Sequence, residues 1–190
     1  MADIDRKARL GRDDWVMAGL RALVRGGASA VNVESLARDI GATKGSFYWH
    51  FKDLAEFHQV MLERWEDLAT KTITSTAKAS GLDGRGQLML LVDMVSVLPG
   101  EAFGGVEVEP ALREWGRTDA RARSVLERVD RQRLEDLAGF LRAAGVAAPD
   151  LPGMAQLIYA GVIGLESLRL TTGAEMRPAL HALVARLLRP

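Results

Sequence analysis

The segment from Asn32 to Lys52 predicts two short helices joined by one tight turn. Asn32 is a good N-cap, and the apolar positions that follow it end at Ile40. Gly41 stops this helix after about two turns, and Thr43 is placed to cap the next one. Two helices this short, joined by so tight a turn, are typical of a helix-turn-helix.

The second of these helices carries a run of rings, Phe47-Tyr48-Trp49-His50-Phe51. Phe47 and Phe51 share one helix face, so we expect both to pack on Leu36 and Ile40. The second helix of a helix-turn-helix lies in the DNA major groove, where its start reaches base edges and its end reaches phosphates. The residue types fit this division, with Thr43, Lys44 and Ser46 at the start and Tyr48 and His50 at the end.

The rest of the chain also predicts helices, because helix formers dominate and long β-branched runs are absent. A first helix carries Trp15 and Leu23 on one face and ends at Gly26-Gly27. A fourth begins at Asp53, which forms a capping-box pattern with Glu56, and runs to about residue 76. Further helices are expected over 88–98, around Leu112 and Trp115, and over 118–144, 153–172 and 178–188, with Pro149 and Pro152 bounding a loop. We therefore expect an all-α protein of about nine helices.

The stretch from Asn32 to Asp53 resembles the DNA-binding domain of TetR-family transcriptional regulators. The resemblance runs from about Asp13 to Phe57 and includes the glycine turn, the threonine cap, Lys-Gly-Ser, Tyr-x-His-Phe-Lys and the capped fourth helix, in that order. It implies a helix-turn-helix DNA-binding domain with a basic N-terminal arm over 1–52 and a larger helical effector-binding and dimerisation domain over 53–190. It also implies a homodimeric, ligand-responsive regulator, expected to be a repressor, which binds an inverted-repeat operator and is released by a small-molecule effector.

The resemblance assigns roles to particular residues of the helix-turn-helix. It implies base contacts from Thr43, Lys44 and Ser46, a close approach to DNA at Gly45, and phosphate contacts from Tyr48, His50 and Lys52. Trp49 is expected to be a packing or groove-edge ring rather than a base contact. Two positions depart from the family pattern. Leu54 stands where the family often has a lysine, and Glu34 where some members have a basic or polar residue.

In the larger domain, the resemblance implies an effector pocket among the helices, for a ligand of unknown identity. The plausible lining residues, each of which also fits an ordinary core, are Met61, Trp65, Leu90, Met94, Trp115, Phe140 and Tyr159. An apolar ligand of moderate size is favoured, although Glu101, Glu107 and Glu109 in the loop over 99–110 could favour a cation or simply be solvated.

The last two predicted helices are apolar on more than one side, which indicates burial against a partner. The residues that we expect at a dimer interface are Leu165, Leu168, Leu180, Val184 and Leu187. The alternative is an ordinary buried hairpin in a monomer.

Other function classes find little support in the sequence. The chain has no cysteine, its three histidines do not cluster, and it lacks metal, phosphate-loop and dinucleotide motifs, so we expect no catalytic site, no cofactor and no metal. A helical ligand-binding or interaction protein with lost or altered DNA binding stays open, because the net charge is zero. The cations that favour DNA are Arg6, Lys7, Arg9 and Arg12, in a segment that could equally be a solvated tail.

No signal region is visible and no apolar run looks long enough to cross a membrane, so we expect a cytoplasmic protein with no membrane partner.

Overall fold

The computed structural model describes residues 10–97 and 107–189, and every regular element in these two ranges is helical. The all-α prediction of about nine helices is therefore confirmed for the described part of the chain. The elements are α1 (Arg12–Ala30), α2 (Val33–Asp39), α3 (Lys44–His50), α4 (Leu54–Ala79), α5 (Gly84–Ser96), α6 (Val108–Gly116), α7 (Ala120–Ala143), the 3-10 turn η2 (Ala148–Asp150), α8 (Leu151–Thr172) and α9 (Met176–Leu187).

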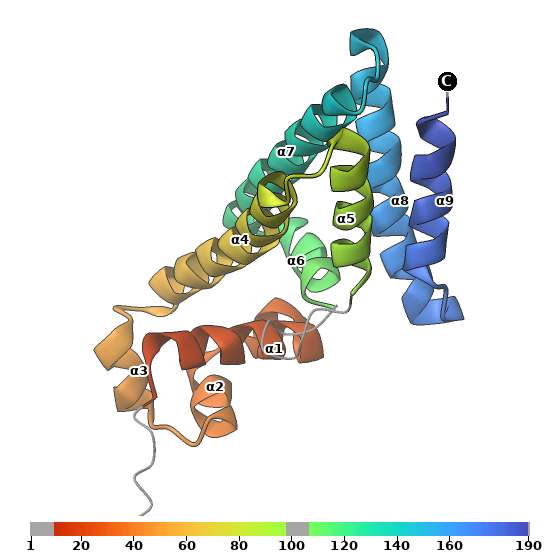
Figure 1. The fold of residues 1–190 in the computed structure, drawn as a ribbon. Helices are drawn as coiled ribbons and strands as arrows, with labels where there is room; N and C mark the ends of the chain where they lie inside the picture. The colour runs from red at the N-terminus through yellow and green to blue at the C-terminus, as the bar shows by residue number, and fades with distance from the viewer. Residues whose placement is uncertain (1–9, 98–106, 190) are drawn as a thin grey trace, which may run out of the picture.

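The helices form two halves that the long helix α4 connects (Figure 1). Helices α1 to α3 make one end of the molecule, and α4 leads from α3 into the other half. There α5, α7, α8 and α9 lie alongside one another, and α6 packs on both α1 and α7. Helix α6 therefore provides a second connection between the two halves, independent of α4.

Local capping explains where the short helices begin. The side chains of Asn32, Thr43 and Asp53 accept hydrogen bonds from the backbone N–H three residues later, at 3.0, 3.2 and 2.8 Å. Gly41 turns the chain between α2 and α3 with a φ of +64°, a conformation that favours glycine. The predicted caps are thus confirmed, and they hold α2 and α3 to seven residues each.

Several predicted boundaries were wrong by a few residues. Helix α5 begins at Gly84 and not at residue 88, because the Asp83 side chain caps it by accepting from the Gly86 N–H at 2.8 Å. Helices α8 and α9 begin at Leu151 and Met176, so Pro152 and Pro178 lie in first turns, where a missing N–H costs no helical hydrogen bond. In α1, the helical conformation breaks at Gly26-Gly27 as predicted, although a short continuation reaches Ala30.

The predicted loop over 99–110 is only partly observable. Residues 98–106, with Glu101, lie outside the described part, as do Arg6, Lys7 and Arg9 of the N-terminal arm. At the end of that loop the prediction was wrong, because α6 begins at Val108 and Glu109 lies in its first turn. The loop glutamate Glu109 is therefore a helical residue with its own partners, which are described below.

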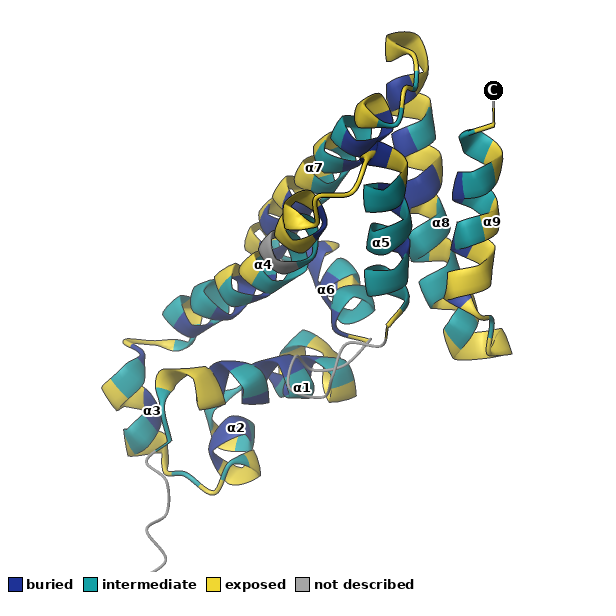
Figure 2. Ribbon diagram, in the orientation of Figure 1, coloured by how far each residue is buried: buried dark blue, intermediate teal, exposed yellow. Residues whose placement is uncertain are grey.

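Two hydrophobic clusters form the core, and their border does not follow the halves of the molecule. The first cluster joins α1, α2 and α3 to the N-terminal part of α4, to α6 and to the start of α7. The second joins α5, the C-terminal part of α7, α8 and α9. Figure 2 shows buried residues on the facing sides of these helices and exposed residues on the outer sides of α8 and α9.

Helix α8, with the 3-10 turn before it, is long and apolar enough to cross a membrane by length and composition, contrary to the sequence-based expectation. Its inner side packs on α7 and α9 and contributes Leu151, Ala155, Ile158 and Tyr159 to the second cluster. It is a core helix of the bundle, and apolar residues on a second side make up the rest of its hydropathy.

Candidate nucleic-acid interface and ligand cavity

Helix α3 has one face in the core and the other in solvent. Phe47 and Phe51 are 0% and 1% exposed, and their rings lie between 4.9 and 5.4 Å from those of Trp15 and Phe57. The prediction that these two phenylalanines point inward is confirmed. This aromatic cluster fixes α3 rigidly, so the residues on its outer face keep a defined position.

The outer face of α3 contains most of the residues predicted to contact DNA. Thr43, Lys44, Gly45, Tyr48, Trp49 and Lys52 are exposed, whereas Ser46 and His50 are half-buried. Tyr48 is 58% exposed and Trp49 is 89% exposed, an unusual exposure for two adjacent aromatic side chains. Large exposed rings of this kind mark a surface that a partner covers.

Lys44 already has a partner in the absence of DNA. Its ammonium group pairs with the Glu34 carboxylate of α2, and both side chains are more than half exposed. The hydrogen bond and the charge of Lys44 lower the pKa of Glu34, which therefore stays ionised at neutral pH. A DNA base or phosphate that binds the Lys44 ammonium group must compete with this carboxylate.

Gly45 has free space around it. A Cβ atom added there would meet only Thr43 Oγ1, at 3.8 Å, which is ordinary contact. Packing within the described part of the chain therefore does not require a glycine at this position. By contrast, a Cβ on Gly19 would approach Met61 Sδ and Phe57 Cζ to 2.7 Å, so Gly19 serves the contact between α1 and α4.

Arg12 joins the end of α3 to the start of α4, a role that the sequence analysis missed. Its guanidinium donates at 2.8 Å to the His50 carbonyl and at 2.8 Å to Glu56 Oε1, and it lies 4.6 Å from the Phe51 ring centroid. Glu56 also accepts from the Lys52 N–H at 2.8 Å, which is the main reason that its pKa is lowered. Arg12 was predicted as part of the basic arm, but it acts as an internal clamp that sets the position of Lys52.

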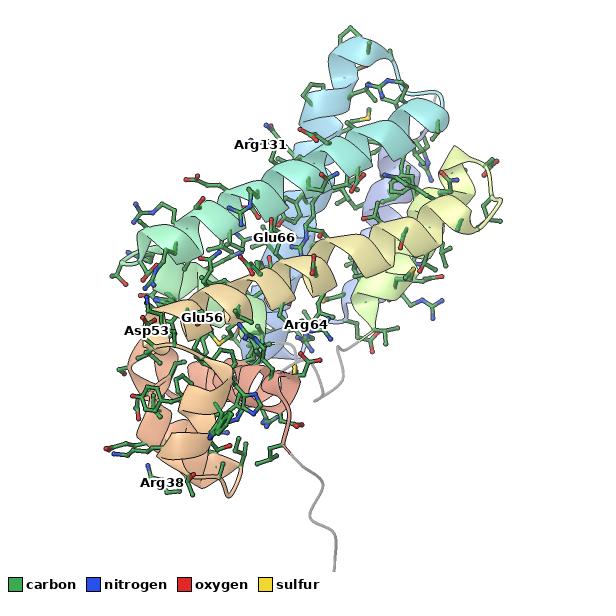
Figure 3. All side chains as sticks on the ribbon, turned by 90° about the vertical axis from the view of Figure 1, so that its left-hand side faces the viewer. Arg38, Asp53, Glu56, Arg64, Glu66 and Arg131 are labelled. Carbon is green, nitrogen blue, oxygen red and sulfur yellow. The ribbon has the colours of Figure 1, made fainter. Side chains whose placement is uncertain are left out.

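Arg38 is a further exposed cation of the helix-turn-helix that the analysis did not single out. It lies in the last turn of α2, where its side chain donates to Ser35 Oγ at 3.4 Å. Figure 3 shows Arg38 at the end of the molecule that is remote from Arg131 and Glu66, on the same end as the helix-turn-helix. The signal available in the sequence was its position, as a cation in the last turn of a short predicted helix.

The second half contains a small cavity of about 80 Å³ between α4, α5, α7 and α8. Of the predicted ligand residues, the structure brings Phe140 and Tyr159 to this cavity. Met61, Trp65 and Trp115 belong to the first hydrophobic cluster instead, where Trp115 packs edge-on against His58 at 5.0 Å. Leu90 and Met94 are half-buried on α5, whose cavity-lining residues are Leu91, Val92 and Val95.

A half-buried polar network closes one end of the cavity. Arg133 Nη1 donates at 2.9 Å to each carboxylate oxygen of Glu109 and at 2.9 Å to the Tyr159 hydroxyl. Arg113 bonds to Glu109, to Asp130 and to the same hydroxyl, which donates to Asp130 Oδ1 at 2.6 Å. Glu109 and Arg113 belong to α6, so the network ties the cavity wall to the helix that packs on α1.

Glu166 lies close to this network on α8. Burial, and secondly the negative charge of Glu109, raise the pKa of Glu166 to about 7. Between the pKa of an unfolded glutamate and about 7, the folded chain therefore binds more protons than the unfolded chain. Stability from this group is present at low pH and falls as the pH rises through that window.

Replacing Glu166 by glutamine is expected to raise the free energy of unfolding at pH 8 by about 1–2 kcal/mol, after discounting for the partial exposure of Glu166. At pH 3 the two proteins should differ little, because Glu166 is then protonated in both the folded and the unfolded state. Urea unfolding of both proteins at the two pH values measures the difference. A gain of equal size at both pH values would contradict the assignment to ionisation.

The predicted dimer residues divide between the interior and the surface. Leu180 and Val184 are 0% exposed inside the second cluster, so their assignment to a dimer interface is corrected. Leu165 and Leu187 are half-buried, and Leu168 is 50% exposed. The sequence analysis missed Leu157, which is 56% exposed on the same helix as Leu168.

No group of three or more histidine, aspartate or glutamate side chains is arranged to hold a metal ion in residues 10–97 and 107–189. The carboxylates of Glu109, Asp130 and Asp136, which line the cavity or its polar end, are paired with arginine, lysine or tyrosine.

Comparison with known proteins connects the helix-turn-helix with one family. The family model for bacterial regulatory proteins of the tetR family matches residues 16–57, the segment that forms α1 to α3 and the start of α4. This segment of the chain is therefore similar to the DNA-binding domain of the tetR family. TetR-family proteins are transcriptional regulators with a helix-turn-helix that binds DNA, and they are not enzymes. A search of curated proteins found no match.

Solved structures extend the similarity in fold over nearly the whole chain. A putative TetR-family regulator from Rhodococcus sp. is 21% identical, with a TM-score of 0.78, over 94% of this chain and 98% of that chain. A putative regulator from Saccharomonospora viridis, solved with choline, is 19% identical, with a TM-score of 0.74, over 93% and 94%. A TetR-family regulator from Agrobacterium tumefaciens is 15% identical, with a TM-score of 0.70, over 90% and 96%. The helices after α3 therefore have the TetR fold as well.

Proposed function

We propose that this protein is a ligand-responsive repressor of the TetR family in the cytoplasm, which binds an inverted-repeat operator as a homodimer and leaves it when an effector binds. The observation that carries the proposal is the outer face of α3, where Lys44, Gly45, Tyr48 and Trp49 are exposed on a helix fixed from behind by buried rings. Residues 1–52 form the proposed reading domain, and residues 53–190 the effector-binding and dimerisation domain.

The proposed roles follow from position along α3. Thr43, Lys44 and Ser46 at its start face base edges, Gly45 lets the backbone approach the DNA, and Tyr48, His50 and Lys52 hold phosphates. Trp49 covers the groove edge. Lys52 has a backbone N–H already held by Glu56, so its side chain leaves the surface in a set direction.

The proposed dimer uses the outer side of α8. Leu157 and Leu168 are exposed there, and a Cβ on Gly164 would meet nothing within 4 Å, so the stripe between the leucines has room for a second helix. A twofold dimer built on this stripe presents two copies of α3 to successive major grooves. Leu165 and Leu187 border the stripe from α8 and α9.

The proposed effector site is the cavity beside Phe140 and Tyr159. Two elements lead from it to the reading domain: α4, which lines it with Ala69, Ile73 and Thr74 and begins next to Lys52, and α6, which reaches it through Glu109 and Arg113. The complex of the Saccharomonospora viridis protein with choline supports a small-molecule effector. An effector that fits the cavity better in one arrangement of these helices shifts the protein away from the DNA-binding arrangement.

The test begins with selection of bound fragments from sheared DNA of the source genome. Recovery of one inverted repeat supports the proposal, and that repeat then serves as the probe for two variants. Tyr48→Phe is expected to weaken binding about 10- to 30-fold on every sequence alike, because each of two subunits loses a phosphate contact. Lys44→Ala is expected to change which base is preferred at one position of the half-site. Competition binding with a series of altered repeats measures this preference.

Two results would argue against this function. If Tyr48→Phe altered the preferred sequence, the division of roles along α3 would be wrong. If no fragment were enriched with ligand-free, refolded protein, the alternative would gain support, namely a helical ligand-binding protein with lost DNA binding. The observation that favours that alternative is the Lys44–Glu34 ion pair, because Glu34 already binds the ammonium group that is proposed to contact a base.

A further inference from the structure

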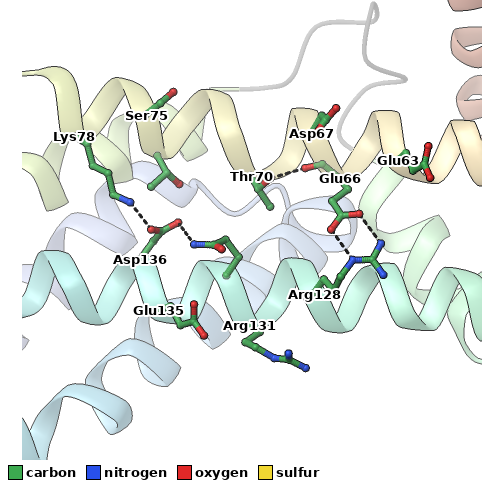
Figure 4. Close-up of a pocket in the computed structure, with 12 residues that line it drawn as sticks. Glu63, Glu66, Asp67, Thr70, Ser75, Lys78, Arg128, Arg131, Glu135 and Asp136 are labelled. Carbon is green, nitrogen blue, oxygen red and sulfur yellow. Dashed lines mark hydrogen bonds and ion pairs between the residues drawn. The ribbon is translucent and has the colours of Figure 1, made fainter.

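A charged groove on the outer side of the second half lies next to the cavity. The groove lies between α4 and α7 and has a volume of about 840 Å³ (Figure 4). Its charged lining residues are the acids Glu63, Glu66, Asp67, Glu135 and Asp136 and the bases Lys78, Arg128 and Arg131. Among the lining residues that the structure describes, carboxylates outnumber cations by five to three. Such a groove raises the local concentration of cations and lowers that of anions.

The groove and the cavity share part of their walls. Thr74 of α4 and Asp136 of α7 line both of them, so the groove and the cavity meet at these two residues. The inner side is apolar, with Ile73, Leu137 and Phe140 among its lining residues. A ligand bound at these two residues therefore has acidic groups on one side and apolar groups on the other.

Asp136 is the acidic residue that lines both spaces, and its present partner is easily displaced. Its side chain is 10% exposed and accepts from Lys78 Nζ at 2.7 Å and from Gln132 Nε2 at 3.2 Å. The Lys78 side chain is 59% exposed, so it can move into water at little cost, as exposed lysines in ion pairs generally do. Figure 4 shows the Lys78 side chain reaching across from α4 to Asp136 on α7.

The other charged residue of the cavity, Arg133, is already satisfied. Both oxygens of Glu109 and the Tyr159 hydroxyl accept hydrogen bonds from it. A ligand carboxylate would have to break this network, whereas a ligand ammonium needs only to take the place of Lys78. The electrostatics at Asp136 therefore select for positive charge.

We propose that the cavity binds a small amphipathic amine, whose ammonium group replaces that of Lys78 at Asp136 while its apolar part fills the cavity. This inference gives the chemical class of the ligand at the proposed effector site. Only the effect of that ligand on DNA binding rests on the proposed function. Lys78–Asp136 and Arg128–Glu66 both tie α4 to α7. The amine removes one of these two ion pairs and leaves the other.

The experiment uses the full-length protein and n-butylamine hydrochloride, with sodium butyrate, butan-1-ol and ammonium chloride as matched probes at constant pH and ionic strength. Binding is followed by methyl NMR of the cavity isoleucines, leucines and valines. We expect n-butylamine to bind with a dissociation constant on the order of millimolar, as suits so few atoms, and at least about tenfold more tightly than butyrate or butanol.

Asp136→Asn is expected to remove this preference. Lys78→Met is expected to tighten amine binding about 3- to 10-fold, because the competing ammonium is gone.

Glu127→Gln is the matched control, because Glu127 is an exposed carboxylate of α7 outside both linings. It is expected to change amine binding less than about twofold. Lys78→Met keeps the test decisive if Asp136→Asn unfolds, since Lys78 is an exposed residue. Tighter binding of butyrate, equal binding of all three butyl probes, or unchanged amine affinity in Lys78→Met would each overturn the proposal.

The ligand class and the regulatory role can fail separately. Amine binding is measured here without DNA, so its absence overturns the ligand class whatever the protein does at an operator. Amine binding that leaves the affinity for the selected operator unchanged upholds the ligand class and overturns the role of this cavity as the effector site.

Discussion

Replacing Arg133 by methionine is expected to lower the free energy of unfolding by about 3 kcal/mol, the largest stability effect among the changes considered. Methionine keeps much of the apolar stem, so the loss comes from the charge and its bonds. Glu109 would lose two hydrogen bonds and keep Arg113 alone, and the Tyr159 hydroxyl would lose one of its donors. Urea unfolding at pH 7, followed by circular dichroism, measures the change.

Arg128→Met is the matched control on the same helix. Arg128 also pairs with a glutamate, Glu66, at 2.6 Å, but its side chain is 46% exposed, against 22% for Arg133. Its replacement is expected to cost less than about 1 kcal/mol. Equal losses in the two variants would show that burial of the Glu109 network does not set its contribution.

Replacing Gly45 by alanine is expected to stabilise the protein and to abolish most of its DNA binding. Gly45 is the second residue of α3, where alanine is favoured over glycine by less than the roughly 1 kcal/mol of a helix interior, and the added Cβ meets only Thr43 Oγ1 at 3.8 Å. If α3 lies against DNA at this residue, the methyl group holds both reading helices away from their grooves. We expect the affinity for the selected operator to fall at least about 100-fold, with losses in each of two half-sites.

Gly139→Ala on α7 provides the matching control, since a Cβ there meets nothing within 4 Å. It should give at least as large a gain in stability, with unchanged operator affinity. Thermal unfolding and fluorescence anisotropy on labelled operator measure the two quantities. Full operator affinity in Gly45→Ala would place the DNA elsewhere than on the Gly45 side of α3.

The sequence was most informative where structure depends on neighbours in the chain. Asn32, Thr43 and Asp53 cap their helices through residues three positions away, and Gly41 sets its turn by its own conformation. The inward positions of Phe47 and Phe51 follow from their spacing alone. These local signals were enough to predict the helix-turn-helix and its outer face.

The ligand cavity could not be located in this way. Periodicity showed correctly that Met61, Trp65 and Trp115 are buried, but it contains no information on which of two clusters buries them. The contacts that define the cavity join distant segments, such as Arg133 with Glu109 and Lys78 with Asp136. The clamp by Arg12 was missed for the same reason, because its partners His50 and Glu56 lie far along the chain.

The border between the two hydrophobic clusters has a consequence for protein engineering. Specificity of such regulators would naturally be altered by transplanting residues 1–52 between chains, at the junction before Asp53. In this protein that cut crosses the first cluster, in which Phe57, Met61 and Trp115 pack with residues of α1 to α3. A transplanted segment 1–52 would therefore have to pack on side chains of α4 and α6 that come from a different protein. Compatible exchanges have to carry that surface with them, or else change only the outer face of α3.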